Sequence, residues 1–184
     1  MSFYTVKGSI PNKRHTKFLT AGKELLYEEL VSRQGFSGIF SNLYHLRMPT
    51  RVKKIENFIR TQLYNDELVH KPLHFQTSKI KTNGDAISSR LTMLYNSDVV
   101  ISKSHFNASM DYCYRNADFD EVIYIQSGKG KLLTNFGTLD YENGDYIVIP
   151  RGVIWHINCD NKTHALVIES SGPVKTPKKN RNEF

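Results

Sequence analysis

Acidic and imidazole side chains between residues 118 and 156 are the groups of this sequence that could do chemistry. Asp118, Asp120 and Glu121 stand together in the stretch NADFDE, and His156 follows further along the chain. A carboxylate and an imidazole brought together could bind a divalent metal, and paired carboxylates could transfer protons. Adjacent acids at a turn into a strand are more often solvated, so we interpret the three acids as a solvated group.

Two short apolar runs must position these side chains. Both are rich in Val, Ile and Tyr, and turn-forming Gly, Asn and Ser residues follow or separate them, which predicts antiparallel strands. Neither run alternates cleanly between apolar and polar residues, so each carries apolar side chains on both faces. This pattern indicates strands packed on two sides, in a sandwich or double-sheet barrel. The two predicted central strands are Glu121–Gln126 and Tyr146–Ile149.

Further strand-like runs recur along the second half of the chain, at Ile87–Tyr95, Asp98–Lys103, Ala108–Tyr114 and His164–Ser170. A spacing of about 8 to 12 residues with turns between runs is typical of an all-β sandwich or barrel. We therefore expect an N-terminal arm and accessory segment over residues 1–85, with short extra strands or a helix. A jelly-roll β-sandwich is expected over 86–172, and a basic connecting segment over 173–184.

Composition narrows the classes of partner. The net charge is +7 and the pI is about 9.3, but the Lys and Arg residues are spread along the chain without a basic helix or a nucleic-acid reader motif. We expect no nucleic-acid partner. No apolar run approaches the length of a membrane span and the first residues do not resemble a signal peptide, so a cytoplasmic protein without membrane contact is expected. Cys113 and Cys159 are predicted to be buried, reduced thiols in strands.

Glycines around the two central strands carry a resemblance to the cupin superfamily. Glu121 and Gly128 resemble the second half of the first cupin motif, and Gly144, Pro150 and Gly152 resemble the start of the second. Cupins are jelly rolls, and many of them hold a metal ion inside. The resemblance thus implies the same fold that the strand pattern predicts.

The metal ligands of the cupin motifs are missing from this sequence. The paired histidines that should precede Glu121 are replaced by Arg115 and Ala117, or by Tyr114 and Asn116, depending on the spacing. The histidine of the second motif should stand at Trp155. His156 is one residue later, and a shift of one residue along a strand turns the side chain to the opposite face. We therefore expect no metal site. Glu121 should pair with Arg115 or a backbone donor, and His156 should lie at the surface or rim.

Five residues are weak candidates for binding a ligand. Arg115 and Arg151 lie at the ends of the motif strands and could hold a carboxylate through two hydrogen bonds. Ion pairs with Asp118, Asp120 or Glu121 are the favoured interpretation. If the chain is instead a cupin that binds a small anion, Tyr124, Tyr146 and His156 are expected to face the interior, where they would line or fill a cavity. The candidate ligand-binding residues are Arg115, Glu121, Tyr124, Arg151 and His156, and no catalytic or metal-binding residue is proposed.

Stretches at both ends of the chain extend the resemblance to the N-terminal half of the homogentisate 1,2-dioxygenase family. They are PNKRHTKF at 11–18, GFSG at 35–38, Tyr44–His45, PTRV at 49–52, RNADFDE at 115–121, IPRG at 149–152 and KTPKKNRNEF at 175–184. Members of that family use non-haem Fe(II) and O2 to convert homogentisate to maleylacetoacetate in tyrosine catabolism, and they assemble as hexamers of two trimers. Their iron is bound by two His and one Glu in the C-terminal half.

The resemblance implies a metal-free cupin half with a structural and assembly role, part of a homo-oligomer and inactive alone. We expect the chain to bind no iron, to consume no O2 with homogentisate, and to be continued past Phe184 in a longer protein. Two alternatives stay open. The chain could be a stand-alone cupin that binds a small anionic ligand such as an aromatic acid, or a small metal-dependent cupin enzyme.

Overall fold

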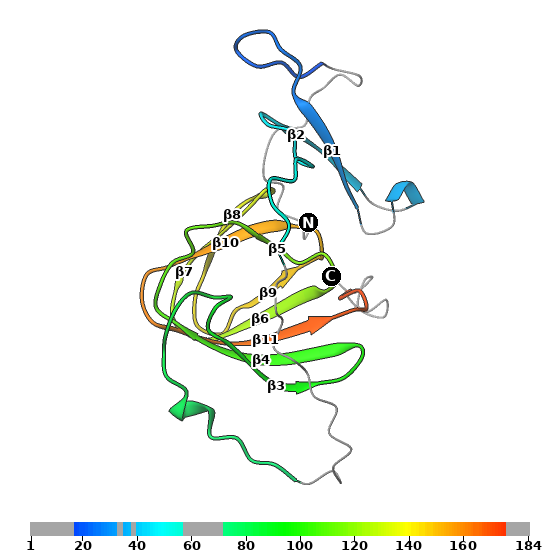
Figure 1. Ribbon diagram of the computed structural model, residues 1–184. Coiled ribbons are helices and arrows are strands. Elements are labelled where there is room, and N and C mark those ends of the chain that lie inside the picture. Colours follow the sequence, from blue (N-terminus) through cyan, green and yellow to red (C-terminus); the bar gives the residue numbers. More distant parts are fainter. Residues whose placement is uncertain (1–16, 33–34, 38–39, 57–71, 176–184) are drawn as a thin grey trace, which may run out of the picture. The chain divides into compact units, whose positions relative to one another are not determined.

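A computed structural model describes residues 17–32, 35–37, 40–56 and 72–175 (Figure 1). Apart from two single-turn 3-10 helices, η1 (Gly35–Ser37) and η2 (Thr77–Lys79), the regular structure of these residues is all strand, which confirms the all-β prediction. The chain divides into two compact units, residues 1–59 and 60–184. The domain boundaries expected from the sequence stay predictions. Within the described ranges no helix has the length and apolar character needed to span a bilayer.

The first unit is built on an antiparallel hairpin of β1 (Tyr27–Ser32) and β2 (Phe40–His45), in which Tyr27 lies opposite His45. The sequence left a helix or a strand open for this region, and the structure contains the strand. An isolated two-stranded hairpin is only marginally stable. Cross-strand side-chain contact reinforces it, because Nε2 of His45 lies 2.8 Å from Oε2 of Glu29. Residues 1–16, at the start of the expected N-terminal arm, lie outside the described residues.

The second unit is a sandwich of two antiparallel sheets (Figure 1), as expected for a jelly roll. The five-stranded sheet has the order β3 (Arg90–Tyr95), β4 (Val99–Phe106), β11 (Thr163–Ser170), β6 (Asp120–Ser127), β9 (Tyr146–Ile149). The four-stranded sheet has the order β5 (Tyr114–Arg115), β10 (Ile154–Cys159), β7 (Gly130–Thr134), β8 (Gly137–Tyr141).

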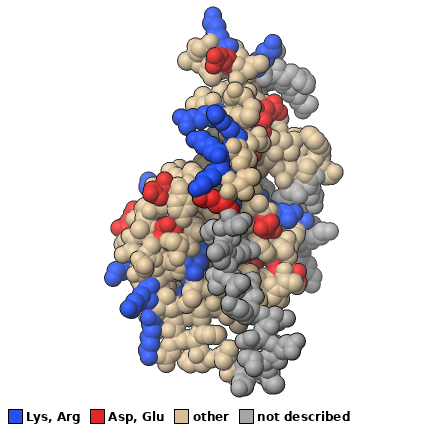
Figure 2. Space-filling view, viewed as in Figure 1, with Lys and Arg blue, Asp and Glu red and all other residues tan. Residues whose placement is uncertain are grey.

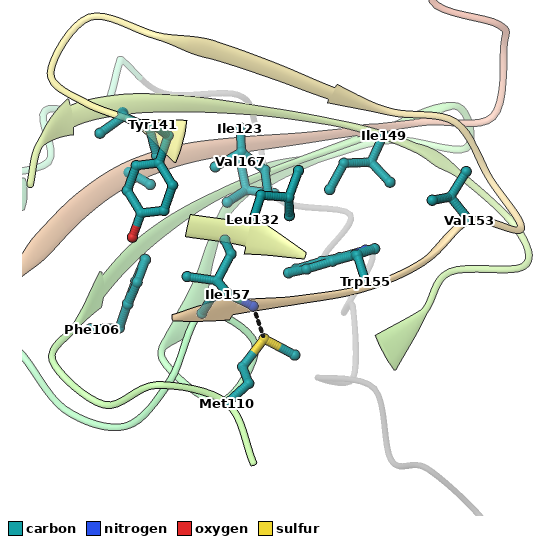
Figure 3. Packing of buried hydrophobic residues seen from close by; sticks show 13 residues of the cluster. Phe106, Met110, Ile123, Leu132, Tyr141, Ile149, Val153, Trp155, Ile157 and Val167 are labelled. Atoms are coloured by element: carbon teal, nitrogen blue, oxygen red, sulfur yellow. Dashed lines mark hydrogen bonds between the residues drawn. The ribbon is translucent and has the colours of Figure 1, made fainter. Parts of the chain in front are cut away.

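Alternation along each strand sends one row of side chains into the space between the sheets. Ile123 of β6 is paired with Val167 of β11 and with Ile147 of β9, and Ile123 and Val167 are fully buried. From the four-stranded sheet, Trp155 and Ile157 are buried against them (Figure 3). The interior is thus filled by large side chains. The labelled members in Figure 3 are Phe106, Met110, Ile123, Leu132, Tyr141, Ile149, Val153, Trp155, Ile157 and Val167.

Several strand predictions need correction. The predicted central strand Tyr146–Ile149 is β9, with the expected bounds, but it lies at the edge of its sheet. Its apolar residues do point to both faces, yet only Ile147 and Ile149 pack on the core, while Tyr146 and Val148 are exposed. The predicted strand Ala108–Tyr114 is irregular up to β5. That stretch is instead held by contacts with β10, such as Met110 Sδ, which accepts a hydrogen bond from the backbone N–H of Ile157.

The two cysteines also differ from expectation. Cys113 precedes β5 and is exposed, and Cys159 ends β10 and is partly buried. Both are free thiols. The prediction that they are reduced therefore agrees with the structure, whereas burial of both and a strand position for Cys113 were wrong.

Basic side chains do not gather in one place on the face shown in Figure 2, where Lys and Arg occur at several separate positions with Asp and Glu among them. One basic group lies on the outer face of the five-stranded sheet, where Lys103 and His105 are buried. The rings of His105 and His164 stack there with centroids 3.9 Å apart, and Nδ1 of His105 lies 3.1 Å from the carbonyl oxygen of Ile80. Burial lowers the pKa of His164, and the neighbouring His105, Lys103 and Lys162 lower it further.

The lowered pKa of His164 predicts a loss of stability in mild acid. The pKa of His164 is 6.5 in the unfolded chain and lower in the folded chain. Below pH 6.5, His164 is therefore protonated in the unfolded chain but not in the folded chain, so the free energy of unfolding falls as the pH drops. The loss ends only below the folded pKa. We expect the melting temperature to fall between about pH 7 and pH 5, and His164→Gln to reduce this slope. His156→Gln is the control, and an equal slope in parent and His164→Gln would contradict the prediction.

Candidate functional site

Four positions that carry metal ligands in the cupin motifs converge inside the sandwich. Of the two possible spacings before Glu121, the structure turns Tyr114 and Asn116 inward. The ring of Tyr114 packs edge-on against Trp155, with centroids 5.4 Å apart, because the two residues are paired across β5 and β10. Glu121 of β6 is buried and paired across the sheet with Glu169 of β11. The motif geometry is therefore retained although the histidines are absent.

A guanidinium group joins these positions. Arg90, the first residue of β3, donates from Nη1 to Oε1 of Glu121 at 2.6 Å, and the same nitrogen lies 3.8 Å from Oε1 of Glu169. The other carboxylate oxygen of Glu121 accepts a hydrogen bond from the indole Nε1 of Trp155 at 3.1 Å. Asn116 donates from Nδ2 to Oε1 of Glu169 at 2.9 Å. One cation thus holds two carboxylates that also accept hydrogen bonds from motif positions. We call Arg90, Asn116, Glu121, Trp155 and Glu169 the Arg90 network.

The network is buried, which makes its pairing obligatory. The side chains of Arg90, Glu121 and Glu169 are 11%, 1% and 8% exposed. Nε of Arg90 donates to the carbonyl oxygen of Ala86 at 3.2 Å, and its guanidinium carbon lies about 6 Å from the ring centroids of both Tyr114 (5.9 Å) and Trp155 (6.0 Å). Nη2 is buried without a hydrogen-bond acceptor. Aromatic faces attract a cation at this distance, which offsets part of that cost.

The donors at these positions do not fit a divalent metal. An indole N–H and an amide NH2 have hydrogens to donate but no lone pair for a metal, and both are directed at carboxylates. Catalytic non-haem iron sites require two histidines and one carboxylate. The described residues contain no cluster of three or more His, Cys, Asp and Glu side chains that could hold a metal ion. We therefore derive no metal chemistry from this part of the chain.

The candidate ligand-binding residues are not gathered in one place. Glu121 is inside the barrel, and its hydrogen-bonding partners, Arg90 and Trp155, are not those expected from the sequence. Tyr124 lies on the outer face of the five-stranded sheet, where its ring stacks on Tyr146 at 4.6 Å. His156 points away from Trp155, as the one-residue shift predicted, and its Nδ1 lies 3.8 Å from Sγ of Cys113. Arg115 and Arg151 are exposed. The expectation that Tyr124, Tyr146 and His156 face the interior does not hold, because alternation gives that side to Ile123, Ile125, Ile147, Trp155 and Ile157.

The acidic group NADFDE is not solvated as a whole. Asp118 is exposed, but Asp120 and Glu121 are buried. The two carboxylate oxygens of Asp120 accept backbone N–H groups of Arg151 and Val174, both at 2.9 Å. Asp120 therefore ties the second motif and the segment after β11 to β6. Neither acid is available for proton transfer with a ligand at the surface.

Sequence reasoning missed Arg90, Glu169 and the inward role of Asn116. A signal was present, because Arg90 is the single charged residue of the run RLTMLY and Glu169 ends the apolar run ALVIE. Charged residues are almost never fully buried unless paired. Single charges of opposite sign in two predicted buried strands could have suggested that they meet inside the sandwich.

Known proteins resemble this chain over its whole length or over parts of it. A family model described as homogentisate 1,2-dioxygenase N-terminal matches residues 39–178. A protein of Saccharolobus solfataricus, provisionally named a dioxygenase, is 36% identical over the full length of this chain and 48% of its own. Homogentisate 1,2-dioxygenase of Bradyrhizobium diazoefficiens is 32% identical over 35% of this chain and 17% of its own. The chain thus spans about half the length of the first of these curated relatives.

Solved cupin structures resemble the sandwich. A cupin-2 domain protein of Shewanella frigidimarina has 19% identity and a TM-score of 0.42, covering 48% of this chain and 83% of that one. A cupin protein of Bacteroides fragilis has 18% identity and a TM-score of 0.41, covering 56% of this chain and 95% of that one.

Proposed function

Because this chain belongs to the homogentisate 1,2-dioxygenase N-terminal family, we propose that it is the N-terminal cupin half of a ring-cleaving dioxygenase. In this proposal the half contributes packing surface for assembly and no catalytic group, and it is inactive alone. Homogentisate is the substrate that the family name suggests, and in this proposal the iron site belongs to the C-terminal half of a longer protein. The observation that carries the proposal is the apolar outer face of the five-stranded sheet.

The outer face is organised in rows that cross all five strands. One row runs through directly paired residues of β3, β4, β11, β6 and β9, on the side of the sheet opposite the row that contains Ile123. Its two ends, Leu94 and Val148, are 55% and 46% exposed. Every residue in it is aliphatic: Leu94, Ile101, Ile168, Val122 and Val148.

A second outer row carries aromatic surface. Tyr124 and Tyr146 stack at one end of it, with Tyr146 70% exposed, and Leu91 is exposed at the other end. Fully burying one large apolar side chain is worth about 1.5–3 kcal/mol, so a partner that covers both rows would gain several times that amount. Lys103 is buried in the middle of this second row and interrupts it, so the apolar surface is made of the aliphatic row and the exposed ends of the second row. Exposed apolar surface of this kind is typical of a protein interface. We propose a C-terminal cupin half as the partner because the longer relative extends well beyond the matched half.

The test measures assembly and turnover together. The chain alone should consume no O2 with homogentisate, whereas co-expression with the C-terminal half of the Saccharolobus solfataricus relative should yield a complex that does. Val148→Asp should reduce complex formation at least tenfold while leaving the melting temperature within a few degrees of the parent. The control variant Thr138→Asp lies on the exposed edge strand β8 of the other sheet. It should change neither complex formation nor the melting temperature.

Light scattering on the chain alone provides the complementary measurement. The uncovered outer face should make the isolated half associate as its concentration rises, and Val148→Asp should diminish that association. Homogentisate turnover by the chain alone would contradict the proposal and favour a small cupin enzyme. A parent chain that stays monomeric at high concentration would instead favour an independent cupin.

A further inference from the structure

We propose that the guanidinium group of Arg90 takes the place of the metal ion in this barrel, as a permanent internal cation that neutralises Glu121 and Glu169. The inference starts from position. Tyr114, Asn116, Glu121 and Trp155 stand where the cupin motifs place metal ligands, and Arg90 contacts or packs against three of them. It goes beyond the proposed function, because it concerns how this half is stabilised and what it can bind.

The hydrogen-bond directions support the substitution. A metal ion requires ligands with free lone pairs, whereas a guanidinium requires acceptors in a plane. Glu121 is the one ligand position that suits both, and here it accepts Nη1 of Arg90 at 2.6 Å. At the former histidine positions stand Trp155 and Asn116, which donate to the remaining carboxylate oxygens. The indole N–H and the amide NH2 offer no lone pair to a metal, and the amide oxygen of Asn116 already accepts the backbone N–H groups of Asp118 and Phe119.

Charge explains why the cation must be present. Two buried carboxylates face each other across β6 and β11, and buried charges of one sign are strongly unfavourable without a counter-charge. The guanidinium group of Arg90 forms an ion pair with each of these two carboxylates, Glu121 and Glu169. Because arginine stays protonated at any physiological pH, the site is occupied by its own cation and has no place for iron. Removing the side chain should leave a carboxylate-lined cation site.

The first experiment truncates Arg90 and supplies a free cation to the folded full chain. Arg90→Ala should melt about 6–12 °C below the parent, as expected when one partner of a buried ion pair is lost. Sub-denaturing guanidinium chloride should then raise its melting temperature in a saturable way, while sodium chloride of equal ionic strength should not. The parent and the exposed-arginine control Arg151→Ala should only be destabilised by guanidinium.

The single tryptophan of the sequence gives a local readout. Its indole N–H bonds to Glu121, so its fluorescence emission should shift in Arg90→Ala and return towards that of the parent as guanidinium binds. The double variant Arg90→Ala/Glu121→Gln should lose this response. Titration of the parent with Fe(II) or Mn(II) should change neither emission nor melting temperature.

The outcomes separate clearly. Absence of a saturable guanidinium effect on folded Arg90→Ala would overturn the proposal, as would stoichiometric metal binding by the parent that shifts the Trp155 emission. If Arg90→Ala fails to fold, Arg90→Lys and Arg90→Met decide the question. Arg90→Lys keeps the positive charge and should melt at a higher temperature than Arg90→Met. Equal or reversed melting temperatures of these two variants would overturn the proposal. Loss of the dioxygenase role would leave these results unchanged, because none of them measures activity.

Discussion

Replacing Ile123 with Asp is expected to unfold the second unit. Ile123 is 2% exposed and lies between Val167 and Ile147 in the row that fills the sandwich. An unpaired carboxylate there loses its hydration and finds no donor, at a cost of several kcal/mol. The whole free energy of unfolding of a domain is about 5–15 kcal/mol. The variant should therefore lose its cooperative melting transition in circular dichroism at temperatures where the parent is folded.

A substitution on the opposite face of the same sheet is the matched control. Val148→Asp introduces the same charge on β9, but Val148 is 46% exposed and points away from the core. It should melt within a few degrees of the parent. If Ile123→Asp also melted within a few degrees, the inward row would be misassigned, whereas collapse of both variants would mean that the outer face is already covered within this chain.

The sequence was most informative where strand pattern and turn chemistry agree. The bounds of β9 and the approximate extents of β6 and β11 follow from runs of Val, Ile and Tyr between turn residues. The pattern could not decide which of the two apolar faces of a strand packs on the core of the sandwich and which lies on the outside. Val122, Tyr124, Tyr146 and Val148 are as apolar as the core residues, yet strand alternation places them on the outer face of the sheet, opposite Ile123 and Ile147.

For the candidate site, only the features that motif spacing and strand alternation decide could be predicted. The missing histidines and the opposite orientation of His156 followed from motif spacing and strand alternation. The rest of the site depends on Arg90 and Glu169, which meet Glu121 only because β3 and β11 belong to the same sheet as β6. No local pattern reports a contact between residues so far apart in sequence. The same reason explains why Glu121 was assigned a neighbour in the chain as its partner.

Turn glycines of the motifs were identified correctly, and their different environments lead to a second large effect. Gly128 has a φ of +111°, and a Cβ added there would lie 2.7 Å from Cα and 2.4 Å from Oγ1 of Thr163. Gly144 also has a positive φ, of +92°, but an added Cβ would meet no atom within 4 Å. Alanine at either position is strained by its backbone conformation, at about 1–3 kcal/mol. At Gly128 it must also displace the backbone of β11.

Gly128→Ala should therefore be much more destabilising than Gly144→Ala. Thr163 is fully buried at the start of β11, and this strand pairs with both β4 and β6, so a displacement of its backbone disturbs the centre of the five-stranded sheet. We expect Gly144→Ala to lower the free energy of unfolding in urea by about 1–3 kcal/mol and Gly128→Ala by a clearly larger amount. Equal losses would mean that β11 yields to the added methyl group, so that the motif requires glycine at residue 128 for its backbone conformation alone.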